Sequence, residues 1–322
     1  MVPVAPLVHA ALSCYHENDF PSVLKLEQTS NGIRAYLGGK HNDYRSGRSK
    51  TVLYSLETSW VLGSDGDCKQ GWAGYCDEGD LSRCRYNIPE VALCEQARTA
   101  FPDHVGGCSP DGFEQKVSVC TAQGGSVYFG ISFYQGEGVW GVGGVGRYDP
   151  WTRQVEIQRP ELLRSSSINQ IVHDGKSLWL GTTGHYECIG LPPTVGLVQL
   201  QWQSGDAKTR TSKNNSGPCG FVVHGLISTE EALWVATDLG ISVLGRTGSS
   251  AGTWRHFVPD LEDGSVMRET TCEALYTELL DSLPRESNGV GDSSYNLLVQ
   301  NLKKFRPAFL QAYEANETKQ SQ

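Results

Sequence analysis

Histidine is the residue type in this 322-residue chain best suited to acid–base or metal chemistry near neutral pH. The chain has eight histidines, and two of them, His173 and His224, fall in strand-like apolar stretches, "SINQIVHDG" (167–175) and "FVVHGLIS" (221–228). They are the candidates for a catalytic site, alone or with a divalent ion. The competing interpretation is that neither histidine has a chemical role.

Carboxylates gather in two short acidic stretches, "GSDGDC" (63–68) and "CDEGD" (76–80). Calcium prefers oxygen-rich loops of this kind. The spacing does not match the D-x-[DN]-x-[DN]-G calcium loop, so solvated turns are the alternative interpretation. The candidate calcium ligands are Asp65, Asp67, Asp77 and Asp80.

Ten cysteines are present, and six of them lie between residues 64 and 120. A zinc site usually needs two close pairs such as C-x2-C, and none of these spacings provides them. An even number of cysteines in Gly- and Asp-rich loops is typical of a disulfide-bearing, exported protein, secreted or periplasmic. The disulfide candidates are Cys68, Cys76, Cys84, Cys94, Cys108 and Cys120, with the connectivity left open.

Aromatic and imidazole side chains also stand in stretches that interrupt the strand pattern, at 40–50, 64–120 and 183–195 and near 134–140. Exposed aromatic side chains in loops are typical of binding surfaces. The candidate binding residues are Tyr134, Trp140, His185 and Tyr186.

The elements that must position these residues are repeated. Each copy has a polar or glycine turn, then an apolar residue, an aromatic residue, a second apolar residue, and Gly or Ala. The copies are "NGIRAYLGG" (31–39), "QGGSVYFGI" (123–131), "HDGKSLWLGT" (173–182) and "TEEALWVAT" (229–237), with aromatics Tyr36, Tyr128, Trp179 and Trp234. Strand-like segments precede or follow the copies, which makes about four strands per unit.

Repetition of four short strands predicts an all-β fold, a β-propeller of about five four-stranded blades. One blade cannot bury both of its faces, and packing blades around an axis buries them on one another. The repeat aromatics are therefore expected in the core, and the following glycine is expected where backbones approach closely. Alignment on Trp179 and Trp234 places His224 at the repeat position of Asn169.

The stretch "SINQIVHDGKSLWLGTTG" with "VGLVQL" resembles the propeller repeats of the two-component-regulator family, as do "ALWVATDLGISVL" and "SVYFGISFYQGEGVWGVGGVGRYDP". The resemblance extends over about residues 20–260 and is strongest from 120 to 258. It implies a propeller, often in an extracytoplasmic sensing or binding context, and no catalytic residue, since the motif is structural. The chain departs from the family in having about five units and no kinase segment, so a signalling role does not carry over.

Three regions are expected: an N-terminal segment 1–19 with a possible signal remnant, a propeller 20–260 with a Cys-rich insertion at 64–120, and a helical segment 261–322. Within these regions, helices are expected at 88–101, 271–286 and 293–316. The net charge of −9 argues against a nucleic-acid partner. No apolar run is long enough to span a membrane.

Two functions remain open at this point. The first is a non-catalytic, exported propeller that binds a glycan, peptide or protein on its loop face. The second is a small-molecule lyase or hydrolase with His224 or His173 and a divalent ion at the channel mouth, a reading prompted by a distant similarity to propeller lyases that act on cyclic peptide antibiotics. No G-x-S-x-G elbow is present for nucleophilic catalysis, and the binding hypothesis is preferred.

Overall fold

The computed structural model describes a set of segments from the first strand to a C-terminal helix, and the structural statements below concern these residues. They are 23–37, 48–49, 51–55, 59–62, 66–67, 84, 86–89, 93, 99–100, 115–133, 143–164, 166–183, 196–210, 217–220, 223–237, 239–259 and 267–282.

Most of the described residues belong to four antiparallel sheets. The first sheet contains β1 (Val23–Thr29), β2 (Gly32–Leu37), β4 (Thr51–Ser55) and β5 (Ser59–Leu62). The second contains β7 (Gln115–Gln123), β8 (Ser126–Phe133), β9 (Gly144–Asp149) and β10 (Gln154–Gln158). The third contains β11 (Ser167–His173), β12 (Leu178–Thr183), β13 (Leu197–Gln201) and β14 (Asp206–Arg210). The fourth contains β15 (Val223–Ser228), β16 (Ala232–Thr237), β17 (Gly240–Gly245), β18 (Trp254–Pro259) and β19 (Met267–Thr270).

Smaller elements complete the described chain. A two-stranded sheet pairs β3 (Arg48–Ser49) with β6 (Gly66–Asp67). Helix α3 (Cys272–Ser282) follows β19 directly. Within the described residues, no helix is both long and apolar enough to cross a membrane. The protein is therefore mostly β-structure, as the sequence predicts.

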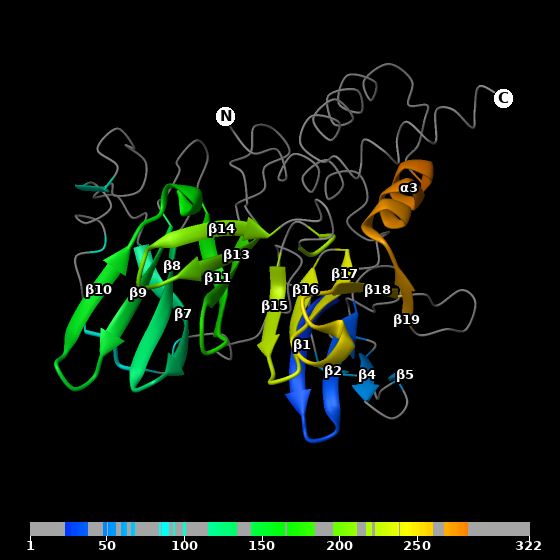
Figure 1. Ribbon diagram of the computed structural model, residues 1–322, viewed down its shortest axis with the longest axis horizontal. Helices are drawn as coiled ribbons and strands as arrows, with labels where there is room; N and C mark the ends of the chain where they lie inside the picture. The colour runs from blue at the N-terminus through cyan, green and yellow to red at the C-terminus, as the bar shows by residue number, and fades with distance from the viewer. Residues whose placement is uncertain are drawn as a thin grey trace, which may run out of the picture.

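The sheets pack side by side through their first strands. Strand β7 contacts β11, β11 contacts β15, and β15 contacts β1. The order in space is thus second, third, fourth and first sheet, so the N-terminal sheet packs against the C-terminal one. Figure 1 shows β1 and β2 beside β15 and β16, with the arrows of β1 and β15 pointing the same way.

The repeat aromatics lie in the core, as predicted. All four are in second strands and buried, and the Trp179 side chain is only 3% exposed. Trp234 packs across the contact between the fourth and first sheets, with its ring centroid 4.8 Å from that of Tyr54 and 6.2 Å from that of Trp60. These aromatic side chains bury a large apolar area between sheets that could not be stable alone.

The glycines that follow the aromatics allow close approach between sheets, which confirms the predicted role. A Cβ on Gly130 would lie 2.5 Å from Cγ2 of Ile168, in the first strand of the next sheet. A Cβ on Gly181 would lie 2.7 Å from Cγ1 of Val223, in the same relation to the sheet after it. Both distances are shorter than carbon atoms tolerate, so a larger residue would push the sheets apart.

The C-terminal part differs from the sequence prediction in one respect. Strand β19 lies beyond residue 260, where the strand pattern was expected to end, because β19 adds to the edge of β18 by backbone pairing. Helix α3 falls within the helix predicted at 271–286, and Leu93 and residues 99–100, within the segment 88–101, are helical. The segment 293–316 lies outside the described residues.

Candidate functional site

Each first strand has a β-bulge near its start. The register shifts lie between Val23 and Lys25, Val117 and Cys120, Ile168 and Gln170, and Val223 and Gly225. A bulge leaves a residue unpaired and turns its side chain in a new direction. Three of these positions carry polar residues, Ser118, Asn169 and His224. The alignment of His224 with Asn169 predicted from the repeat is therefore correct.

Two of these polar side chains bond to the backbone of the next sheet. Ser118 Oγ lies 2.6 Å from the carbonyl oxygen of Ile168 and 3.1 Å from that of Gly130. Asn169 Nδ2 donates to the carbonyl oxygen of Val223 at 2.7 Å. Both acceptors, Ile168 and Val223, directly precede the bulge of the neighbouring strand. The bulges thus fasten one first strand to the next.

The two predicted catalytic histidines lie apart. His224 is near the start of β15 and 8% exposed, whereas His173 is the last residue of β11. The Asn169–Val223 bond joins the starts of β11 and β15. At their far ends, Arg246 bonds Ser228 and lies beside Asp174, so the two strands run in the same direction. The two imidazoles therefore lie at opposite ends of neighbouring strands. The structure does not bring them together in one site.

His173 takes part in a turn. Its Nδ1 accepts a hydrogen bond from the backbone N–H of Gly175 at 2.9 Å, and its ring centroid is 5.1 Å from that of Tyr128. Burial lowers the pKa of His173 from its ordinary value of 6.5, and the nearby Asp174 carboxylate opposes this shift. The imidazole is therefore neutral at pH 7 with one ring nitrogen already engaged.

Asp174 organises the same turn. Its carboxylate accepts hydrogen bonds from the backbone N–H of Ser177 at 2.7 Å and from Trp179 Nε1 at 2.6 Å. It also lies 3.5 Å from the guanidinium of Arg246 in the fourth sheet. Burial alone would raise the pKa of Asp174, but these hydrogen bonds and the Arg246 charge outweigh it and lower the pKa below the usual 3.8. The Asp-Gly turn of the repeat is therefore a structural device that joins two sheets.

The connections between strands differ at the two edges of the sheets. Where first strands lead to second strands the turns are short, at 30–31, 124–125, 174–177 and 229–231, and we call this side the turn edge. We call the opposite side, where the second strands end, the loop edge. Its connections are longer in three sheets, at 38–47, 134–143 and 184–196, and short in the fourth, at 238–239.

The predicted binding residues belong to the connections of the loop edge. Tyr134 and Trp140 follow the end of β8, and His185 and Tyr186 follow the end of β12. All four lie outside the described residues, so their role stays a prediction.

The predicted calcium ligands are only partly within the described chain. The backbone of Asp67 pairs with Arg48 between β6 and β3. Asp65, Asp77 and Asp80 lie outside the described residues, so the calcium site also stays a prediction.

Two disulfides are present among the described residues. Cys84 bonds to Cys120 on β7, and Cys219 bonds to Cys272 at the start of α3. Every described cysteine is thus in a disulfide. The other predicted disulfide candidates, Cys68, Cys76, Cys94 and Cys108, lie outside the described residues.

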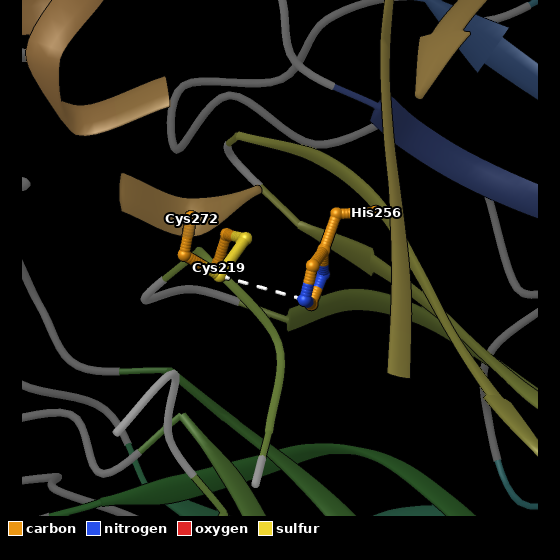
Figure 2. Close-up of side chains that lie close together, drawn as sticks. All are labelled: Cys219, His256 and Cys272. Atoms are coloured by element: carbon orange, nitrogen blue, oxygen red, sulfur yellow. Dashed lines mark hydrogen bonds between the residues drawn. A yellow bond between two sulfur atoms is a disulfide. The ribbon is translucent and has the colours of Figure 1, made fainter. Parts of the chain in front are cut away.

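The second disulfide belongs to a buried cluster with His256 of β18 (Figure 2). Nε2 of His256 lies 3.5 Å from Sγ of Cys272, and Nδ1 lies 2.9 Å from Oγ of Ser242 on β17. The same hydroxyl accepts a hydrogen bond from the backbone N–H of Cys219 at 3.4 Å. Burial lowers the pKa of His256 to about 4, with the Glu269 charge opposing the shift, so the ring is neutral at pH 7.

Sequence reasoning missed this cluster. Cys219 and Cys272 are 53 residues apart, and no motif spacing connects either with His256. The pairing of β17, β18 and β19 places His256 beside Ser242 and near Cys272, and the backbone N–H of Cys219 bonds to Ser242 Oγ. Among the described residues, these three side chains form the one group whose donor atoms could share a metal ion, with the atoms within 4.8 Å of one another.

Comparison with known proteins gives weak likenesses only. No protein-family model and no curated protein matches the chain. The extracellular domain of a B. thetaiotaomicron protein described as a hybrid two component system is 16% identical, with a TM-score of 0.33, over 74% of this chain and 28% of that one. A second structure from that organism, described as the extracellular domain of a one component system, is 19% identical, with a TM-score of 0.32, over 76% of this chain and 29% of that one.

Cobalt-substituted apocarotenoid oxygenase from Synechocystis is 12% identical, with a TM-score of 0.23, over 70% of this chain and 45% of that one. The chain thus spans less than half the length of each of these three structures. At such identities and scores, none of them defines the function of this chain.

Proposed function

We propose that this chain is an exported, disulfide-stabilised β-propeller that binds a glycan, peptide or protein partner at its loop edge. The observation that carries the proposal is the difference between the two edges of the sheets. At the turn edge, first and second strands are joined by short turns. At the loop edge, three of the four sheets join their second strand to the next strand through the longer stretches 38–47, 134–143 and 184–196. In folds built from repeated sheets, binding residues are carried by loops that a rigid scaffold positions.

The packing order supports a ring of blades. Four sheets contact one another through parallel-running first strands, and the first sheet packs on the fourth. A propeller is closed by the same kind of contact between its N-terminal and C-terminal blades. Residues 68–114, which connect the first sheet to the second, are long enough to supply a fifth blade. The propeller would then span about 20–260, with β19 as an extra edge strand and a helical segment after it.

The disulfides support export. Cys84–Cys120 and Cys219–Cys272 join segments separated by 36 and 53 residues, respectively. Such bonds persist in secreted and periplasmic proteins and are rare in the reducing cytosol. A calcium ion at the acidic stretches 63–68 and 76–80 would serve to hold a loop in place.

A capture experiment tests the binding face. The protein is screened on an array of immobilised glycans and against a displayed peptide library, and the strongest probe is kept. Tyr134→Ala, Trp140→Ala and Tyr186→Ala are expected to weaken capture of that probe at least tenfold. Trp151→Ala is the matched control, because Trp151 is 90% exposed on the β9–β10 turn, at the turn edge. Equal capture by all four variants would contradict the proposal.

The lyase or hydrolase alternative gains no support from the described histidines. His173 and His224 lie at opposite edges, and the Nδ1 of His173 is already bonded within its turn. The two histidines therefore cannot act together on one substrate as general acid and general base. A site built on either histidine alone with a divalent ion stays a prediction.

A further inference from the structure

The buried cluster of Cys219, Cys272 and His256 has the composition of a metal site as well as that of a disulfide. Their three donor atoms, two sulfurs and one imidazole nitrogen, lie within 4.8 Å of one another. Thiolate and imidazole are the ligands that zinc prefers in proteins. We propose that, when the Cys219–Cys272 disulfide is reduced, the two sulfur atoms and His256 Nε2 bind one divalent cation of the zinc class.

Metal binding requires the two sulfur atoms to separate and the donor atoms of the cluster, now within 4.8 Å of one another, to come slightly closer to the ring nitrogen. Zinc binds sulfur at about 2.3 Å and imidazole nitrogen at about 2.0–2.1 Å, which separates its ligand atoms by about 3.5–3.8 Å. Nε2 of His256 is already 3.5 Å from Sγ of Cys272. The Cα atoms of the two cysteines are 5.1 Å apart, so after reduction their side chains can rotate to separate the two sulfur atoms.

Neighbouring groups favour metal binding by the His256 imidazole and by the Cys272 thiolate. Ser242 Oγ, 2.9 Å from Nδ1, holds the ring of His256 in place and can accept a hydrogen bond from Nδ1–H, which leaves the Nε2 lone pair toward the sulfur atoms. Metal-binding histidines commonly have such a partner on the second nitrogen. Cys272 is the first residue of α3, where the helix dipole favours a thiolate. Figure 2 shows the imidazole pointing toward the two cysteines.

Burial shields the three ligand atoms from bulk water. Cys219 and Cys272 are each 2% exposed and His256 is 5% exposed. Three protein ligands leave a fourth zinc position for water or another small ligand. The anchor that ties α3 to the fourth sheet would thus have two chemical forms, a disulfide in an oxidising compartment and a metal bridge in a reducing one. This inference does not depend on the partner-binding proposal.

Reduction of the Cys219–Cys272 disulfide needs a two-electron reductant from outside the protein. A phosphine reduces the disulfide by two electrons and takes oxygen from water, which gives the phosphine oxide and two thiols. One Zn²⁺ then replaces the two thiol protons, which are released to solvent. In a cell, a dithiol would take the place of the phosphine and would itself become a disulfide.

The test uses the full chain, reduced with a phosphine without oxygen and titrated with Zn²⁺ against a chromophoric chelator. Cys219→Ser/Cys272→Ser is compared with Cys84→Ser/Cys120→Ser, which removes the other described disulfide and leaves the cluster intact. The first variant is expected to bind one Zn²⁺ fewer than the reduced wild type, and the second is expected to retain the cluster's Zn²⁺. Ser242→Ala should weaken this Zn²⁺ by about 10- to 100-fold. The oxidised wild type should lack the cluster's Zn²⁺.

The proposal fails if the reduced Cys219→Ser/Cys272→Ser variant binds as much Zn²⁺ as the reduced wild type. It also fails if oxidised and reduced wild type bind alike. Near-ultraviolet circular dichroism follows the fold in parallel. If reduction unfolds the chain, recovery of the native spectrum on adding Zn²⁺ supports the site, and no recovery overturns it. With Co²⁺ in place of Zn²⁺, thiolate charge-transfer absorption should appear in the reduced wild type and weaken in the cluster variant.

Discussion

The turn edge and the loop edge both join neighbouring sheets through polar side chains, but their connections differ in length. At the turn edge, Asp174 fastens a short hairpin through Trp179 and reaches Arg246 in the next sheet. At the loop edge, Asn169 and Ser118 bond to the first strand of the next sheet, close to the start of the longer connections. Both edges are thus fastened to the next sheet. They differ in the length of chain that joins the first, second and third strands, which is short at the turn edge and longer at the loop edge of three sheets. Binding residues are commonly carried by loops that a rigid scaffold positions.

The largest effect on stability is expected at the contact between sheets. Gly181→Val should lower the free energy of unfolding by about 3 kcal/mol, because its side chain would overlap Val223 of the next sheet. Gly175→Ala at the turn edge should cost only about 1 kcal/mol, because φ is +91° but the space around it is open. Urea unfolding measures both. A smaller loss in Gly181→Val than in Gly175→Ala would contradict the close approach of the sheets.

A smaller loss is expected for Asp174→Asn, about 1.5–3 kcal/mol, since hydrogen bonds to a charged group are replaced by neutral ones. The pKa of Asp174 is lowered in the folded protein, so its carboxylate stabilises the fold above the unfolded value of 3.8. This contribution disappears as pH falls through the folded pKa. Unfolding measured from pH 7 to pH 3 should therefore show a constant difference between wild type and variant near neutrality that shrinks at acid pH. A difference that grows toward pH 3 would contradict this account.

At the loop edge, Asn169→Ala should cost about 1 kcal/mol, because the Val223 carbonyl loses a donor. Hydrogen exchange should rise at the start of β15 more than at its end. Gln170→Ala, at a neighbouring position of β11 outside this bond, is the matched control. Uniform exchange along β15 would show that the bulge bond does not join the two strands.

The smallest effect is expected for Trp151→Ala at the turn edge. Its side chain is 90% exposed, and its backbone N–H, which the substitution keeps, is the group that bonds Asp149. The free energy of unfolding should change by no more than about 0.5 kcal/mol. A larger loss of stability, measured by thermal unfolding, would mean that the Trp151 side chain makes contacts that stabilise the fold.

The sequence predicted the second strands well, because their aromatic and apolar alternation is bounded by turns. Strands β7 and β14 were not predicted, because "QKVSVCTAQ" and "DAKTR" are largely polar and depend on neighbouring strands for pairing. The Cys219–Cys272–His256 cluster could not be predicted either, because its members are far apart in the sequence and meet only in the folded chain.

The measurement that tests the central claim most directly is hydrogen–deuterium exchange of the protein with and without its captured glycan or peptide. We expect protection of the loop-edge segments 134–143 and 184–196, with no change in the turn-edge segments 149–154 and 173–178. Protection confined to the turn-edge segments would contradict the account.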